Sequence, residues 1–176
     1  MKRATLGSLL SLWLLACGAP QQGGPDGLLE PGTPAPDFMA QDQHGEVRQF
    51  RILNRNRPVV LFFYPRDGTP GCTREACAFR DAWDRLQATG AIVVGVSTDD
   101  VESHARFAEE HDLPFPLLAD PDGHVLRAYR VPSRLGMAAR VTYIVGADGR
   151  IARVFPEVDP AVHADEVIAA LNELAP

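Results

Sequence analysis

The chain has 176 residues, of which 45% are hydrophobic and 23% are charged. This composition is that of an ordinary globular protein with one domain, and it excludes fibrous, collagen-like and wholly disordered proteins. The 17 basic and 23 acidic residues give a net charge of -6, with no basic block that could neutralise a phosphate backbone, so nucleic acid is not an expected partner. Three cysteines are too few for a disulfide scaffold.

The first sixteen residues are typical of an export signal. A short basic start precedes an apolar run over residues 9–16, which is too short to span a bilayer as a mature helix. The run ends in LLAC (residues 14–17), which resembles the lipobox of bacterial lipoproteins. This resemblance implies that Cys17 becomes the lipid-modified first residue of the mature chain. The alternative is an ordinary secretory signal that happens to contain a cysteine.

Residues 18–36, GAPQQGGPDGLLEPGTPAP, are rich in Gly and Pro, which predicts a flexible tether. A tether suits a domain held at a membrane surface. We therefore expect a signal peptide over residues 1–16, a lipidated cysteine and its tether over 17–36, and one folded domain over 37–176. The expected location is the exported side of a bacterial membrane, either periplasmic or outer, where disulfides are tolerated.

Short apolar runs alternate with helical patterns in the first half of the folded part. The alternation over residues 46–52 suggests an extra edge strand or hairpin. The continuous apolar runs VVLFFY (59–64) and AIVVGV (91–96) are those of central strands buried on both faces. Between them, apolar residues at helical spacing predict an amphipathic helix over about 72–86.

The second half of the chain predicts two further helices, a strand and a hairpin. In chain order these are a helix over 100–111, a strand over 115–118, a turn at 120–123, a hairpin of 140–145 with 151–155, and a last helix opening at Asp159-Pro160, with Ala164, Ile168, Leu171 and Leu174 on one face. A mixed sheet of parallel and antiparallel strands with flanking helices is typical of the thioredoxin-like α/β fold.

Cys72 lies where the buried strand ends and the helix begins, in the segment YPRDGTPGCTREACAFRD. Thr69 is a candidate N-cap, Pro70 suits the first helical position, and Gly71 lets the backbone approach a small ligand. A thiol in the first turn of a helix lies near free N–H groups and the positive end of the helix dipole, which favour the nucleophilic thiolate. The alternative is that Cys72 is a small buried hydrophobic residue.

Cys77 follows Cys72 by five residues. In a helix this spacing places it about 140° around the axis and about 7.5 Å along it. A disulfide needs Cα atoms within about 7 Å, so an intact helix cannot hold a bond between the two cysteines. If they react, the first turns of the helix must unwind. The alternative is that Cys77 is a buried spectator.

This segment resembles the peroxiredoxins, and among them the Q type, also called the bacterioferritin comigratory protein group. The peroxide-site motif of that family is Pro, three residues, Thr or Ser, two residues and Cys, which Pro65, Thr69 and Cys72 match. Q-type members often add a resolving cysteine five residues later, as at Cys77. The resemblance covers nearly everything from about residue 31 onward, and it implies a thiol-dependent peroxidase.

The resemblance also implies a role for each residue of the site. Cys72 is the peroxidatic residue, which attacks a hydroperoxide and becomes a sulfenic acid, and Cys77 resolves that acid as an intramolecular disulfide. Thr69 hydrogen-bonds the thiolate and the peroxide, and Pro65 shields the pocket from water. Arg140 matches the active-site arginine of the family and holds both thiolate and peroxide.

Two further expectations concern this arginine and the partners. The sequence alone favours a solvated arginine at the end of a strand, and only the family position indicates the active site. If Arg140 is in the site, Glu75 is expected to orient it through a salt bridge. The implied partners are a hydroperoxide substrate and a thioredoxin-like thiol reductant, and we expect a monomer or a weak dimer.

The histidines show no paired metal-ligand spacing, and we expect each to be a surface or loop residue; they are His44, His104, His111, His124 and His163. No metal or other cofactor is therefore expected.

Three other functions stay open. An exported thioredoxin-like thiol-disulfide oxidoreductase would carry CxxC, which is absent. A copper-carrying lipoprotein of the same fold would carry CxxxC with a downstream histidine, whereas four residues separate Cys72 from Cys77. The third is a non-catalytic surface lipoprotein that only binds a partner.

Overall fold

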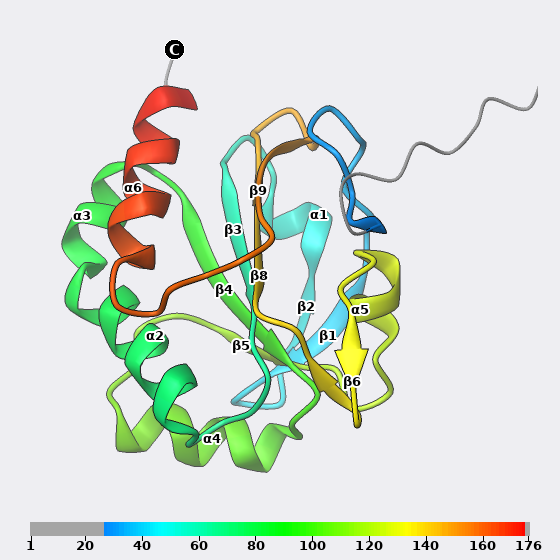
Figure 1. Ribbon diagram of the computed structural model, residues 1–176, viewed down its shortest axis with the longest axis vertical. Coiled ribbons are helices and arrows are strands. Elements are labelled where there is room, and N and C mark those ends of the chain that lie inside the picture. The colour runs from blue at the N-terminus through cyan, green and yellow to red at the C-terminus, as the bar shows by residue number, and fades with distance from the viewer. Residues whose placement is uncertain (1–26, 175–176) are drawn as a thin grey trace, which may run out of the picture.

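The computed structural model describes residues 27–174, and the predicted export signal and Cys17 lie outside this range. The described chain forms a seven-stranded mixed sheet with helices on both faces (Figure 1). The strand order is β2-β1-β5-β4-β3-β8-β9, and β6 and β7 form a separate small hairpin. This is the thioredoxin-like α/β fold that the sequence predicts.

The helices and strands follow one another in the chain with these bounds: β1 (Met39–Asp42), β2 (Val47–Gln49), α1 (Phe50–Leu53), β3 (Val59–Phe63), α2 (Pro70–Asp81), α3 (Trp83–Ala88), β4 (Ile92–Ser97), α4 (Val101–Glu110), β5 (Leu117–Ala119), α5 (His124–Ala128), β6 (Ser133–Arg134), β7 (Met137–Ala138), β8 (Val141–Val145), β9 (Ile151–Phe155) and α6 (His163–Leu174).

Strand β3 lies at the centre because its side chains alternate between two hydrophobic cores. Val60 and Phe62 belong to the core that α2, α3, α4 and α6 cover, on the left in Figure 1. Val59, Leu61 and Phe63 belong to the core on the other face, which α5 covers. All five side chains are buried, so the predicted strand is confirmed.

The partners of β3 bring distant segments to one edge of the sheet. β3 runs parallel to β4 and antiparallel to β8, with Phe63 opposite Val141. The residue that follows β3 therefore lies beside the residue that precedes β8. The predicted hairpin of β8 and β9 is also present, with a register shift at Ile144 and Val145.

The single helix predicted over 72–86 is two helices, α2 and α3. Ala82 separates them with φ -92° and ψ 9°, outside helical geometry. The apolar stripe continues through this break, because Phe79, Ala82 and Leu86 are all buried. A hydrophobic pattern at helical spacing therefore could not reveal the break.

The segment over residues 46–52 is only partly a strand. β2 pairs antiparallel with β1, which confirms the predicted hairpin. The chain then turns into α1, so Ile52 is 65% exposed, while Phe50 is buried and stacks on Phe38.

The packed part of the chain begins before residue 37, where we expected the domain to begin. Leu28 and Leu29 are buried, and the N–H of Gly32 donates to a carbonyl of β9 at 2.7 Å. This segment packs against the domain although Gly and Pro surround the two leucines, because burial of large apolar side chains compensates for the entropy lost when the backbone is ordered. The remaining part of the predicted tether, residues 17–26, lies outside the described residues.

Four short elements, α1, α5, β6 and β7, are absent from the sequence prediction. The predicted apolar face of α6 ends at Leu171, because Leu174 is 44% exposed. Within the part of the chain that the structure describes, every helix is too short or too polar to cross a bilayer.

Candidate active site

Cys72 lies in the first turn of α2, directly after the loop that follows β3. Thr69 is the N-cap residue and Pro70 the first helical residue, as predicted. The N–H of Thr73 already donates to the carbonyl of Thr69 at 2.9 Å, so the helix is regular from its first turn. Cys72 is 2% exposed. Its thiol therefore lies at the positive end of the helix dipole, in a place largely closed to water.

Arg140 reaches Cys72 across 68 positions of sequence. Its Nη2 atom lies 3.3 Å from the Sγ atom of Cys72. The pairing of β3 with β8 explains this contact, because Arg140 immediately precedes β8 at the edge where β3 ends. Arg140 is therefore a half-buried residue of the site and not a solvated residue at a strand end.

Glu75 holds the other side of the guanidinium. The Nη1 atom of Arg140 donates to Oε2 of Glu75, and the carboxylate is only 1% exposed. Burial raises the pKa of Glu75 to about 7, against the opposing charge and hydrogen bond of Arg140. Burial alone would lower the pKa of Arg140, but the charges of Glu75 and Cys72 and its hydrogen bonds to both raise it. The expected salt bridge between Glu75 and Arg140 is present.

Gly71 makes this arrangement possible. A Cβ atom at position 71 would lie 3.2 Å from Nη2 of Arg140, which is closer than nearly all real contacts of this kind. We expected Gly71 to leave room for a small ligand. The group that lies closest to its missing Cβ atom is instead the guanidinium of Arg140.

Thr69 and Pro65 lie in the loop that leads from β3 to Cys72. The hydroxyl of Thr69 donates to the carbonyl of Arg66 at 3.0 Å. It makes no capping hydrogen bond to the helix, and its single hydrogen is engaged by Arg66. The expected hydrogen bond from Thr69 to the thiolate or peroxide therefore requires the hydroxyl to rotate. Pro65 is half-buried in the same loop.

Cys77 lies in the same unbroken helix as Cys72, and both are free thiols. Cys77 is half-buried. The regular geometry of α2 therefore separates the two cysteines as the sequence predicts, and a bond between them requires α2 to unwind.

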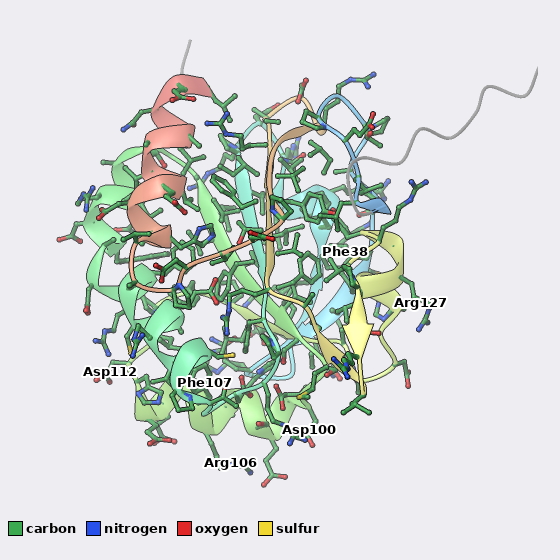
Figure 2. All side chains as sticks on the ribbon, in the orientation of Figure 1. Phe38, Asp100, Arg106, Phe107, Asp112 and Arg127 are labelled. Atoms are coloured by element: carbon green, nitrogen blue, oxygen red, sulfur yellow. The ribbon has the colours of Figure 1, made fainter. Side chains whose placement is uncertain are left out.

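Two histidines contradict the prediction that all five lie at the surface or in loops. His163 is buried on α6, with Nε2 2.8 Å from the hydroxyl of Thr142 and its ring edge-on to Phe79. Burial lowers the pKa of His163. His104 is buried on α4, although Arg106 on the same helix points away from the molecule (Figure 2).

A sequence signal for His104 was available. His104, Phe107 and Ala108 share one face of α4 at helical spacing, and all three are buried. Among residues 27–174, no group of side chains could hold a metal ion.

Comparison with known proteins gives the family. The sequence model of the AhpC/TSA family matches residues 31–154. The chain belongs to this family. A relative from Coxiella burnetii, described as a putative peroxiredoxin bcp, is 39% identical over 150 residues, which cover 81% of this chain and 99% of the relative. The chloroplastic peroxiredoxin Q of Sedum lineare is 40% identical over 146 residues, covering 81% of this chain and 78% of the relative.

Solved structures agree with the sequence relatives. The crystal structure of peroxidoxin BcpB from Mycobacterium tuberculosis has a TM-score of 0.79 at 37% identity, covering 84% of this chain and 99% of that one. The protein is thus a peroxiredoxin related to the Q type, the group that the motif predicts, and its relatives are thiol-dependent peroxidases. An exported oxidoreductase of another kind, or a non-catalytic lipoprotein, is not favoured.

Proposed function

We propose that this peroxiredoxin reduces hydroperoxides with Cys72 as the attacking residue. The thiolate of Cys72 attacks one oxygen of the hydroperoxide, an S–O bond forms and the O–O bond breaks. The leaving oxygen takes up a proton and departs as water or an alcohol. Cys72 is left as a sulfenic acid, because its sulfur has given up the two electrons that the peroxide gained.

The observation that carries this proposal is the 3.3 Å contact between Nη2 of Arg140 and Sγ of Cys72. A fixed cation at this distance stabilises the thiolate before attack and the negative charge that develops on the leaving oxygen. The carboxylate of Glu75 fixes the guanidinium from its other side, so this cation does not need to reorganise during the reaction. Pro65 and Thr69 line the loop on the approach to the sulfur, and Thr69 offers a hydroxyl to the bound peroxide.

The second step uses Cys77. Its thiolate attacks the sulfur of the Cys72 sulfenic acid, an S–S bond forms, the S–O bond breaks and water leaves. Because α2 holds the two cysteines apart, this step follows unwinding of its first turns. A thioredoxin-like dithiol then reduces the Cys72–Cys77 disulfide by exchange and becomes a disulfide itself. The oligomeric state that we propose is a monomer or a weak dimer.

Titration of the reduced soluble domain with hydrogen peroxide tests this proposal. Wild type should lose two thiols rapidly for each peroxide consumed. Cys72→Ser should lose none at that rate, because a serine hydroxyl stays protonated and is a poor nucleophile. Near-normal peroxide consumption by folded Cys72→Ser would contradict the proposal.

We also propose that the domain is exported and held at a membrane by lipid on Cys17. The basic and apolar leader, followed by LLAC at residues 14–17, supports this. The sequence between Cys17 and the buried Leu28 is rich in Gly and Pro, a composition that suits a tether.

A further inference from the structure

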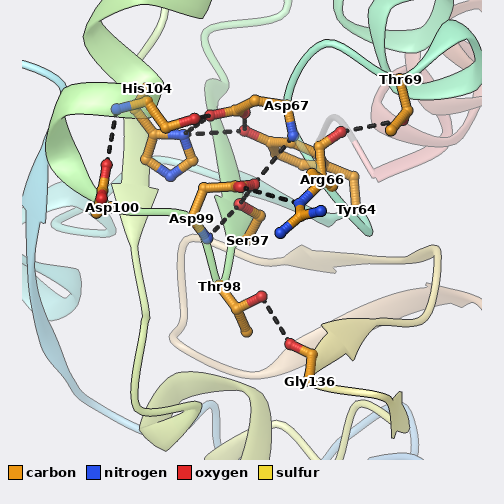
Figure 3. Close-up of polar contacts among 11 residues, drawn as sticks. Tyr64, Arg66, Asp67, Thr69, Ser97, Thr98, Asp99, Asp100, His104 and Gly136 are labelled. Carbon is orange, nitrogen blue, oxygen red and sulfur yellow. Dashed lines mark hydrogen bonds and ion pairs between the residues drawn. The ribbon is translucent and has the colours of Figure 1, made fainter.

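The loop between β3 and α2 is tied down at its middle by Asp67. This loop, residues 64–69, carries Pro65 and Thr69 and delivers the chain to the helix that holds Cys72. Asp67 itself is not part of the peroxide-site motif. Figure 3 shows that its carboxylate points away from Thr69, toward a cluster of polar side chains around His104.

The carboxylate of Asp67 receives three contacts. Oδ1 accepts a hydrogen bond from the hydroxyl of Tyr64 at 2.8 Å. Oδ2 accepts from the hydroxyl of Ser103 at 2.8 Å and lies 2.9 Å from Nδ1 of His104. The carboxylate is 6% exposed. Because Ser103 and His104 both lie on α4, the loop is fastened to a helix that is separate from α2.

The backbone of the same residue makes a second tie. The N–H of Asp67 donates to Oδ2 of Asp99 at 2.9 Å. The same oxygen of Asp99 accepts from the hydroxyl of Ser97 at 2.6 Å, and its other oxygen lies 3.8 Å from the guanidinium of Arg66. Asp99 lies between β4 and α4, so both ties lead to the same neighbouring part of the fold.

The tautomer of His104 follows from the burial of its ring. Its side chain is fully buried, and its Nε2 atom has no hydrogen-bond partner. A hydrogen on Nε2 would be a buried donor without an acceptor, whereas a hydrogen on Nδ1 has Asp67 as acceptor. His104 therefore donates from Nδ1 to the carboxylate.

The charge state of Asp67 matches this network. Burial alone would raise its pKa, but the hydrogen bonds from His104, Tyr64 and Ser103 lower it below the ordinary value. Burial and the charge of Asp67 raise the pKa of Tyr64, so its phenol keeps its hydrogen and donates. The network is thus one ionised acceptor surrounded by donors.

We propose that Asp67 is a positioning residue of the peroxide site, which holds the loop of residues 64–69 against α4 so that Pro65 and Thr69 face Cys72. The inference rests on the proposed function of Cys72. A short loop has few degrees of freedom. Holding Asp67 by both its side chain and its backbone therefore also restricts Pro65 and Thr69, which lie two residues before and two residues after it. A displacement of about 1 Å in groups that orient a substrate slows a reaction by about a hundredfold.

The hydrogen-bond partners of Asp67 lie outside α2, which matters when that helix unwinds. The ties of Asp67 run to Tyr64 at the start of the loop, to Asp99 and to α4, and none runs to α2. When α2 unwinds to let Cys77 reach Cys72, the loop keeps its place. The peroxide site is then ready to re-form as soon as the disulfide is reduced.

The test separates the two steps of turnover in Asp67→Ala and Asp67→Asn. The rate of Cys72 oxidation by hydrogen peroxide should fall by about ten- to a hundredfold in Asp67→Ala. Asp67→Asn keeps one acceptor oxygen and should recover part of that loss. The rate at which Cys77 then forms the disulfide should not fall in either variant, because the ties of Asp67 do not hold α2.

The matched control is Asp42→Ala. Asp42 is also a buried aspartate, and it holds a turn by accepting from the N–H groups of His44 and Glu46 and from Arg48. It lies in β1, which β5 and β4 separate from β3. Asp42→Ala should lower the melting temperature without slowing the peroxide step, which excludes general loss of stability as the cause.

Ser103→Ala supplies a milder change if Asp67→Ala does not fold. It removes one donor from the carboxylate and should slow the peroxide step by about two- to tenfold. An unchanged peroxide step in folded Asp67→Ala, or in Ser103→Ala, would overturn the inference, as would equal slowing in Asp42→Ala. Wild type that consumes no peroxide would overturn the proposed function and this inference together.

Amide hydrogen exchange gives an independent readout. The N–H of Asp67 should stay protected in the disulfide form while that of Thr73 in α2 loses protection. Loss of protection at both positions would show that the loop unwinds together with the helix, and would contradict the inference.

Discussion

Gly71 lies against the guanidinium of Arg140, with only 3.2 Å between Nη2 and the place where a Cβ atom would stand. The same Nη2 atom contacts the sulfur of Cys72. The absence of a side chain at position 71 therefore sets how closely the cation approaches the thiol.

Gly71→Ala should push the guanidinium away from Cys72 and slow the reaction with peroxide by about tenfold, because the strength of the contact depends on its distance. The measurement is the rate of Cys72 oxidation under single-turnover conditions. The same substitution in an Arg140→Ala background should add little further slowing. Equal slowing in both backgrounds would show that the methyl group acts on something other than Arg140.

Arg140→Ala should slow the peroxide step by about a hundredfold, since the cation beside the sulfur is lost. Arg140→Lys keeps the charge but loses the planar guanidinium that contacts Cys72 and Glu75 together. Its rate of Cys72 oxidation should therefore lie between those of wild type and Arg140→Ala. Arg153→Ala is the control, because Arg153 lies on the neighbouring strand β9, half-exposed and paired with Glu173. If the rate of Cys72 oxidation in folded Arg140→Ala matches wild type, Arg140 has no part in the peroxide step.

Glu75 should make stability depend on pH. Its pKa in the folded protein is about 7, above its ordinary value of 4.5. The folded state therefore binds this proton more tightly than the unfolded state, and the stability that it contributes is present below pH 4.5 and lost as the pH rises toward about 7. Relative to Glu75→Gln, the free energy of unfolding of wild type should fall by between about 1 and 3 kcal/mol across this range. Urea unfolding of both proteins at several pH values measures this difference, and parallel curves would contradict the raised pKa.

Cys17→Ala should release the domain from the membrane fraction of cells that express the full chain. Its peroxide chemistry should stay unchanged, because Cys17 has no part in the proposed reactions of Cys72 and Cys77. Cys77→Ser serves as the control and should remain in the membrane fraction. Tight membrane association of Cys17→Ala would show that something other than lipid on this cysteine holds the protein.

Local sequence pattern predicted the elements whose residues alternate or repeat clearly. The apolar run of β3 and the turn into α2 placed Cys72 correctly, since both depend on neighbouring residues. The contact of Cys72 with Arg140 depends on the pairing of β3 with β8, which no local pattern contains; only the family resemblance predicted it.

Other features escaped prediction for physical reasons. The break at Ala82 leaves the apolar stripe intact, so it has no signature in hydrophobicity. Leu28 and Leu29 pack against the domain although their neighbours have the composition of a linker. The network around Asp67 joins a loop to α4 through side chains that, taken singly, are ordinary surface types, and only His104 on the apolar face of α4 gave a sign of it.

Cys77→Ser should stop at the sulfenic acid of Cys72 after one turnover, because no second thiol resolves it. At high peroxide the sulfenic acid should oxidise further to sulfinic acid. Mass spectrometry of the peptide that contains Cys72 measures both products. Recovery of unmodified Cys72 at the rate of wild type would mean that another group resolves the sulfenic acid.

Amide hydrogen exchange of α2, before and after one equivalent of peroxide, tests the two-cysteine mechanism most directly. A disulfide between Cys72 and Cys77 should abolish protection of residues 73–79 in oxidised wild type, because regular helix cannot hold that bond. Cys77→Ser treated in the same way should keep its protection. Equal protection of residues 73–79 in reduced and oxidised wild type, or a disulfide that joins Cys72 to another chain, would contradict the mechanism.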